Sequence, residues 1–345
     1  MKFMKFVKSM QSIQFKFFRF LMLFCLVGII AIALKGCGFG PSQPLKVFKV
    51  GLNTWPGYQI ALYAKEAGIY RQHGLDVKFI RFNNQQDNIR ATMRGSQDAS
   101  FAPLSEVMQV DWNQEKPVFV MVVDISAGSD GIAARPKITS VKDLKGKKVS
   151  AKFSTVSHLV LLEALKANNL KPTDVEIVDV ANERGATLIK QGKIDATVLW
   201  EPLLTDTAKA VGGQVIHTTA DLDSLVIDGL ATRASIIADK QDELIQFIEA
   251  WFETMEAVNR QPQVVFAAVA KQLGVTPETF ATDFQGLKKG DLEMNRRMFA
   301  EGRLEEAYQQ TRQLLLSDLR HGRIVRNDVK IDAGPITKAT RNWQQ

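Results

Sequence analysis

The sequence predicts an α/β protein with two domains, each built on a doubly wound sheet with flanking helices. Short apolar segments that suit buried parallel strands alternate with segments of helical periodicity along most of the chain. That alternation is typical of layered α/β folds. Beyond its basic and apolar N-terminal segment the chain keeps about 300 residues, which is enough for two domains.

The first 36 residues predict an export signal. Residues 1–36 contain six Lys or Arg and no acidic residue, and the run Phe20–Leu34 is almost wholly apolar. A basic segment before an apolar one of this length is typical of a signal peptide. The run is short for a transmembrane helix, which needs about 20 apolar residues. Six of the seven excess positive charges lie in this leader. The charge of the chain therefore gives little support to nucleic-acid binding, and no nucleic-acid partner is expected.

The leader ends in a cysteine motif. Leu34–Cys37 (Leu-Lys-Gly-Cys) resembles the lipobox of bacterial lipoproteins, although Lys35 departs from the small residues usual there. The resemblance implies that Cys37 is lipidated and anchors the protein to a membrane; simple cleavage or an uncleaved anchor are the alternatives. The other cysteine, Cys25, lies in the leader, so cysteine catalysis and cysteine metal sites are excluded from the mature chain. Residues 37–46, with two prolines, predict a tether.

Eight strands and four helices can be placed by pattern. The expected strands are Phe48–Leu52, Val77–Arg81, Ala99–Ala102, Val118–Asp124, Lys148–Ala151, Val175–Val180, Ala196–Trp200 and Gln214–Ile216. The expected helices are Leu159–Asn168, Glu183–Gln191, Asp206–Val211 and Gln241–Asn259. Apolar residues in the last helix recur at helical spacing, which indicates a core face.

The first strand leads directly into an aromatic loop. Trp55 and Tyr58 flank Pro56-Gly57 at the carboxyl end of this strand, where open α/β sheets bind ligands. We expect the two rings to stack on a flat or cationic ligand; packing beneath a loop is the alternative. Gly57 is expected to allow a positive φ and a sharp turn.

Polar side chains follow the next strands as well. Asn83 follows the second strand and Ser105 the third, and both are candidates for hydrogen bonding to a ligand, with turn formation as the alternative for Asn83. Asp124 ends the fourth strand and Asp130 follows it closely. A carboxylate at the end of an apolar strand must find a partner, either backbone N–H groups or a ligand donor.

Two further groups of candidates lie in the second half of the predicted fold. Thr155, Ser157 and His158 stand before a helix, where hydroxyls and free backbone N–H groups can bind an acidic group. N-capping by the hydroxyls and a structural role for the histidine are the alternatives. Trp200 and Glu201 stand where a later strand gives way to a helix.

Two motifs carry a family resemblance. Val50–Tyr58 with the helix and strand after it, and Asp195–Pro202 (Asp-Ala-x-x-x-Trp-Glu-Pro), resemble the nitrate/sulfonate/taurine-type solute-binding proteins of ABC importers, within the thiamine-pyrimidine-synthesis-like superfamily. The resemblance covers roughly residues 47–260.

The resemblance implies a two-lobed periplasmic-binding-protein clamshell. Its two extended crossings are expected at Gly128–Pro136 and Val226–Arg233. One lobe would comprise residues 47–130 plus 232–345, and the other residues 131–231. Asp228, in the second crossing, would then lie near Asp124 and Asp130.

The resemblance also implies a function. We expect an exported monomer that captures a small polar ligand between its lobes and delivers it to a permease and its ATPase subunit, without a cofactor. A tethered sensor is an alternative. The family is also similar to a pyrimidine-synthesis enzyme with a Cys-rich motif and a histidine. The mature chain lacks that motif and its four histidines are scattered, so neither a catalytic nor a metal site is expected.

The charges of the candidates bear on the ligand. Four are carboxylates (Asp124, Asp130, Glu201 and Asp228), and the only cations expected near strand ends are Arg81 and Arg184. Carboxylates beside aromatic rings suit a small cation or an N–H-rich planar ligand. A zwitterion such as taurine could place its acid on the turn 155–157 and its amine on a carboxylate. A sulfonate or nitrate pocket is the alternative.

Overall fold

The computed structural model describes residues 44–343 apart from 112–114, 319, 321 and 323–324. The predicted export signal, Cys37 and most of the tether lie outside the described residues. The described residues from Leu45 onward form one compact unit. Within the described ranges, no helix is both long and apolar enough to cross a membrane.

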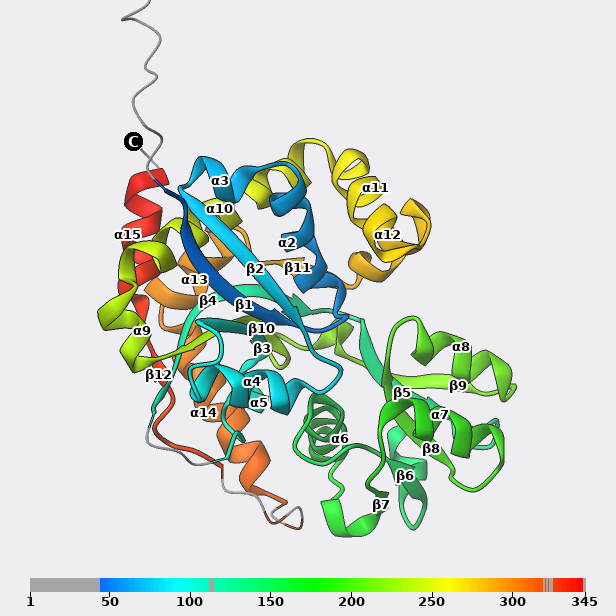
Figure 1. The fold of residues 1–345 in the computed structure, drawn as a ribbon. Helices are drawn as coiled ribbons and strands as arrows, with labels where there is room; N and C mark the ends of the chain where they lie inside the picture. Colours follow the sequence, from blue (N-terminus) through cyan, green and yellow to red (C-terminus); the bar gives the residue numbers. More distant parts are fainter. Residues whose placement is uncertain (1–43, 112–114, 319, 321, 323–324, 344–345) are drawn as a thin grey trace, which may run out of the picture. The chain divides into compact units, whose positions relative to one another are not determined.

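The larger of two sheets has seven strands in the order β11-β4-β10-β3-β1-β2, with β12 paired to β4 (Figure 1). Its strands are β1 (Lys46–Leu52), β2 (Leu75–Arg81), β3 (Ala99–Pro103), β4 (Pro117–Ser126), β10 (Ile227–Arg233), β11 (Leu287–Lys289) and β12 (Lys330–Ile331).

The smaller sheet has five strands in the order β7-β6-β8-β5-β9. They are β5 (Asp130–Ala134), β6 (Lys148–Ser150), β7 (Glu176–Val178), β8 (Ala196–Trp200) and β9 (Gln214–Thr218). Its helices are α6 (Val156–Ala167), α7 (Asn182–Lys190) and α8 (Leu203–Ala210). Three short 3₁₀ turns accompany it, at Val141–Leu144, Pro172–Asp174 and Thr219–Asp221.

Helices cover both faces of the larger sheet. One face packs mainly against α2 (Pro56–Glu66), α3 (Ile69–Gln72), α10 (Gln241–Arg260), α11 (Pro262–Leu273), α12 (Pro277–Gln285) and α15 (Ala333–Trp343). The other packs mainly against α4 (Gln85–Met93), α5 (Leu104–Val107) and α14 (Arg303–Leu316). The remaining helices, α9 (Ala234–Asp239) and α13 (Leu292–Ala300), follow β10 and β11.

Strand β4 shows why the sheet needs two helical layers. All ten of its residues are buried. Val118 and Val120 belong to the core on one face, whereas Phe119 between them belongs to the core on the other. Because side chains alternate along a strand, a wholly apolar strand is stable only when both faces are covered. The predicted fold class, two doubly wound α/β lobes, is confirmed.

The eight strands expected from the sequence appear as β1–β4 and β6–β9, and the four expected helices as α6, α7, α8 and α10. The expected crossings differ, because most of each is a strand. β5 pairs antiparallel with β8 and β9, and β10 pairs antiparallel with β3 and β4. The small apolar residues of β5 and β10 suit central strands. The segments that link the two sheets are therefore shorter than expected and comprise residues 127–129 and 219–226.

Candidate ligand-binding site

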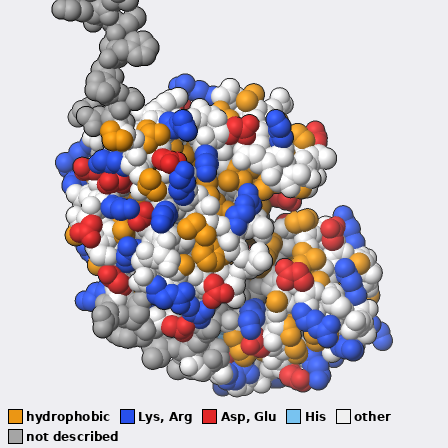
Figure 2. Space-filling model, in the orientation of Figure 1, with side chains coloured by type: hydrophobic (Ala, Val, Ile, Leu, Met, Phe, Trp, Pro, Cys, Tyr) orange, Lys and Arg blue, Asp and Glu red, His pale blue; other side chains and the backbone are white. Residues whose placement is uncertain are grey.

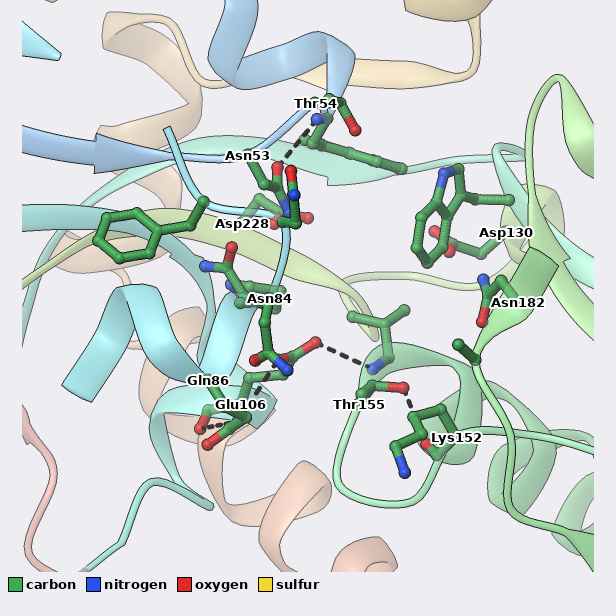
Figure 3. Close-up of a pocket in the computed structure, with 18 of the residues that line it drawn as sticks. Asn53, Thr54, Asn84, Gln86, Glu106, Asp130, Lys152, Thr155, Asn182 and Asp228 are labelled. Atoms are coloured by element: carbon green, nitrogen blue, oxygen red, sulfur yellow. Dashed lines mark hydrogen bonds between the residues drawn. The ribbon is translucent and has the colours of Figure 1, made fainter. Parts of the chain in front are cut away.

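A cavity of about 510 Å³ is lined by residues from both lobes. Figure 2 shows this face hollowed where the two lobes meet. The lining comes from the loops after β1, β2 and β6, from the ends of β3 and β8, from the starts of β5, β10, α6 and α7, and from α4 and α5 (Figure 3). The loops and strand ends after β1, β2, β3, β6 and β8 lie at the carboxyl edges of the sheets, where open α/β sheets bind ligands. Seven sequence candidates line the cavity: Trp55, Tyr58, Asn83, Asp130, Thr155, Trp200 and Asp228.

Asp124 holds Trp55 instead of lining the cavity. The indole Nε1 of Trp55 donates to both carboxylate oxygens of Asp124, at 3.1 and 3.2 Å. Asp124 is 1% exposed, and a Cβ placed on Gly57 would lie 1.8 Å from its Oδ2. Gly57 lies inside α2 and is not among the glycines with positive φ. The expected reason for this glycine was therefore wrong: the position needs glycine because a carboxylate packs against it.

Tyr58 and Asp228 form a second aromatic–carboxylate pair. The Tyr58 hydroxyl donates to Asp228 Oδ1, and the ring stacks on Phe101 with centroids 5.3 Å apart. Asp228 and Asp124 are partners in register on the neighbouring strands β10 and β4. Burial raises the pKa of Asp228 well above its ordinary value, and the charge of Asp124 raises it further. Burial, followed by the charge of Asp228, raises the pKa of Tyr58.

Asp130 has an unused hydrogen-bonding position in the cavity. It begins β5, is 3% exposed, and its Oδ2 has no hydrogen-bond partner among the described residues. Burial raises the pKa of Asp130 to about 7. Burial, together with the charge of Asp130, raises the pKa of Asp124 to about 8 despite the bond from Trp55. Across the described chain, no Lys or Arg forms an ion pair with Asp124, Asp130 or Asp228. Buried carboxylates of this kind need a proton or a positively charged partner.

The sequence analysis missed the amides of the cavity. Gln85 Oε1 and Gln86 Oε1 are acceptors without a partner among the described residues, and Asn182 Nδ2 is such a donor. With Asp130 Oδ2, the fully buried polar atoms of the described lining residues that have no partner are three acceptors and one donor. The available signal was the place of these three amides at the starts of α4 and α7, the helices that follow β2 and β7.

Two cations also line the cavity, contrary to the expectation from the sequence. Lys152 follows β6 and lies 3.0 Å from Asp179, while Arg90 of α4 binds Asp111 and Asp87 at 2.7 and 2.9 Å. Acidic side chains thus offset both cations. Arg81 and Arg184, the cations expected near strand ends, are exposed and do not line the cavity.

The structure does not bring the remaining candidates to the cavity wall. Ser157 donates to Asn182 Oδ1 at 3.0 Å, and fully buried His158 lies 3.2 Å from Asp318. Glu201 accepts from the backbone N–H of Thr205 at 3.1 Å and caps α8. Ser105 is buried within α5. His158 thus has the structural contact considered as its alternative, whereas neither Thr155 nor Ser157 caps α6 with its hydroxyl. Ser105 Oγ is buried without a hydrogen-bond partner among the described residues.

The N-terminus of α6 makes a contact that the sequence did not indicate. The backbone N–H of Val156 donates to Oε1 of Glu106, at 3.4 Å, and the hydroxyl of Thr155 donates to the carbonyl of Lys152 at 2.8 Å. Glu106 lies on α5 of the larger lobe and also lines the cavity. Within the described ranges no group of three or more His, Cys, Asp or Glu residues is placed to hold a metal ion.

Two lobes with a ligand-sized cavity between them are the architecture of periplasmic binding proteins. The periplasmic aliphatic sulphonate binding protein of Escherichia coli has this fold, with a TM-score of 0.65 and 21% identity over 84% of this chain and 96% of that one. A family model described as NMT1/THI5 like matches residues 55–264, more than half of the chain. The chain belongs to this NMT1/THI5-like family.

Curated relatives agree with that assignment. A putative binding protein of Brucella abortus (strain 2308) is 25% identical over 75% of this chain and 81% of its own length. A putative aliphatic sulfonates-binding protein of Escherichia coli (strain K12) is 30% identical over 44% of this chain and 47% of its own length. The family recognised in the sequence is thereby confirmed.

Proposed function

We propose that this protein is the exported solute-binding component of an ABC importer and binds a small cation or an N–H-rich planar or zwitterionic solute between its lobes. The family and the fold support a binding role. One observation supports the ligand class: Asp130 Oδ2 is buried at the cavity without a hydrogen-bond partner among the described residues. A positively charged N–H group of the ligand would supply a hydrogen-bond donor and the positive countercharge that the carboxylates of Asp130 and Asp228 lack.

The aromatic side chains suit the same ligand. Trp55 and Trp200 are partly exposed and line the cavity from different lobes. A guanidinium or an aminopyrimidine could stack on an indole face while its N–H groups donate to carboxylates and amides. The three unused acceptors favour such a donor-rich ligand over one that only accepts hydrogen bonds.

The remaining parts of the proposal concern location and partners. Lipidation of Cys37 would anchor a monomer outside the cytoplasm through the tether 37–46. The permease and its ATPase subunit would receive the ligand unchanged, with no catalytic step. The lobe bounds expected from the sequence, 47–130 plus 232–345 and 131–231, need adjusting in this proposal, because β10 belongs to the larger sheet.

Binding of a sulfonate, taurine or nitrate is the second candidate. The relative in Escherichia coli named as a putative aliphatic sulfonates-binding protein favours it, and Asn182 Nδ2 offers a free donor. A tethered sensor would use the same cavity, and loss of solute uptake on deletion of the gene would distinguish transport from sensing.

Thermal unfolding of residues 38–345 against a ligand panel tests the proposal. The panel holds guanidinium, small amines, aminopyrimidines, taurine, alkanesulfonates, nitrate and bicarbonate. A ligand at about 100 times its Kd should stabilise the protein by about 2.7 kcal/mol. We expect an upward shift of several degrees with guanidinium, an amine or an aminopyrimidine.

A pair of variants assigns the effect to the cavity. Asp130→Asn should abolish the shift, because the amide keeps the size of the side chain but removes its charge. Asp206→Asn, an equal change of charge at an exposed position of α8, should leave the shift intact. Shifts produced by sulfonates or nitrate alone would refute the cation proposal and favour the second candidate.

A further inference from the structure

A carboxylate of the protein already occupies the N-terminus of α6. This twelve-residue helix has no side-chain cap from its own N-cap residue, Thr155. Oε1 of Glu106, from the other lobe, accepts the N–H of Val156 at 3.4 Å instead. Figure 3 draws this contact beside the cavity. Glu106 is 4% exposed, and the amide of Gln86 donates to its Oε2 at 3.4 Å.

The N-terminus of a helix is where an acidic ligand group would be expected to bind. Unpaired N–H groups and the helix dipole favour an anion there, and the contribution decays within the first turn. A sulfonate entering this cavity would find that position taken by Glu106. Asp130 and Asp228 would repel it whenever they are ionised, and the cavity cations Lys152 and Arg90 already pair with Asp179, Asp87 and Asp111.

We propose that Glu106 determines ligand specificity by acting as a built-in anion that fills the N-terminus of α6 and excludes ligands with an acidic group. This inference rests on the proposed ligand-binding role of the cavity. It deepens that role, because it assigns rejection of anions to one side chain. Exclusion by an unfavourable charge is a known route to specificity.

Isothermal titration with methanesulfonate tests the proposal, because this probe carries the acidic group and little else. Glu106→Ala removes both the charge and the side chain, and should bind methanesulfonate about 10-fold or more tightly than the wild type. Glu106→Gln removes only the charge and should show a smaller gain, because the amide still fills the space. Glu176→Gln changes the net charge equally at an exposed position of β7 and should show no gain.

Thermal unfolding of each variant establishes that it is folded before titration. Glu106→Gln keeps the size of the side chain, so it decides the question if Glu106→Ala does not fold. Folded variants of Glu106 with no gain in methanesulfonate affinity would overturn the proposal. So would a wild type that binds methanesulfonate as tightly as they do. Failure of the proposed function is separate: it would appear as wild-type protein that binds no cation of the panel, whatever the variants do with anions.

Discussion

At the scale of single residues, the main feature of this protein is a cluster of buried acidic side chains beside the cavity. Asp124, Asp130 and Asp228 are each at most 3% exposed, and Tyr58 and Trp55 supply the hydrogen bonds that two of them accept. Glu106 adds a further nearby negative charge that raises the pKa of Asp228. The cluster therefore holds protons when the cavity is empty, and a positively charged ligand should lower these pKa values so that the protons are released to solvent.

This cluster predicts how stability depends on pH. In the unfolded chain an aspartate loses its proton near its ordinary pKa of 3.8, whereas in the folded protein Asp130 keeps its proton to about pH 7 and Asp124 to about pH 8. Between these values the folded state binds more protons than the unfolded state. The free energy of unfolding should therefore fall as pH rises from about 4 to about 8, by up to roughly 1.4 kcal/mol per pH unit for each such proton.

Urea unfolding of the ligand-free protein at pH 5, 6, 7 and 8 measures this slope. Asp130→Asn removes one titrating group, so the decline between pH 5 and pH 7 should be shallower in that variant than in the wild type. Asp318 has a pKa lowered to about 2, because the bonds from Arg320 and His158 outweigh its burial, and it titrates below this window. Equal slopes in the two proteins would contradict the assignment to Asp130.

At the scale of elements, the start of α2 is built around one close approach. Asp124 reaches from β4 to the indole of Trp55, and its carboxylate passes against Gly57 in the first turn of the helix. Helix and strand can meet in this way only if position 57 has no Cβ. The placement of the cavity-lining indole thus depends on a glycine that does not itself line the cavity.

Substitution of this glycine should disturb both stability and binding. Gly57→Ala puts a methyl group in the space of Asp124 Oδ2, and we expect a loss of about 1–3 kcal/mol in the free energy of unfolding, as is usual for overpacking. Ligand affinity should fall with it, because Trp55 must move. Denaturant unfolding and titration of a panel ligand measure the two effects.

A double-mutant cycle separates the clash from helix propensity. In an Asp124→Ala background the same Gly57→Ala change should cost less, because the carboxylate is gone. An equal cost in both backgrounds would show that the contact with Asp124 is not the cause.

At the scale of the whole molecule, α6 joins the two lobes. Leu159 and Leu162 belong to a core cluster of the larger lobe, although α6 packs on the smaller sheet. The contacts of Glu106 with Val156 and of His158 with Asp318 reinforce the same junction. We therefore expect any relative motion of the lobes to pivot near α6 and the links 127–129 and 219–226.

A ligand that contacts both lobes should favour the arrangement in which they are closest. Asp228 belongs to the larger sheet and Asp130 to the smaller one, so a donor that bridges them binds the closed form better and shifts the population toward it. Small-angle X-ray scattering should show a smaller radius of gyration with saturating panel ligand, and no change for Asp130→Asn. An unchanged radius for ligand-saturated wild type would contradict closure.

The sequence by itself determined the fold class, the family, eight strands and four helices. These features depend on local periodicity and on short ordered motifs, which the chain displays without any tertiary partner. Seven of the candidates named from the sequence line one cavity. Those at the carboxyl ends of parallel strands could be expected to meet at one edge of a sheet, whereas Asp130 and Asp228 stand at the starts of antiparallel strands.

Only the tertiary structure decided what each side chain does there. Asp124 and Asp130 are the same residue type at nearly the same place in the chain, yet their roles differ. Asp124 accepts a hydrogen bond from the indole of Trp55, 69 residues away, whereas Asp130 lines the cavity with one oxygen that has no partner among the described residues. Val156 and Glu106 meet across 50 residues, and His158 finds Asp318 across 160. Such partners depend on strand order and on packing between lobes, which local periodicity does not contain. For the same reason the residues of β5 and β10 were expected to be crossings between the lobes. They are strands because each pairs with a neighbouring strand on both sides, which the sequence pattern does not reveal.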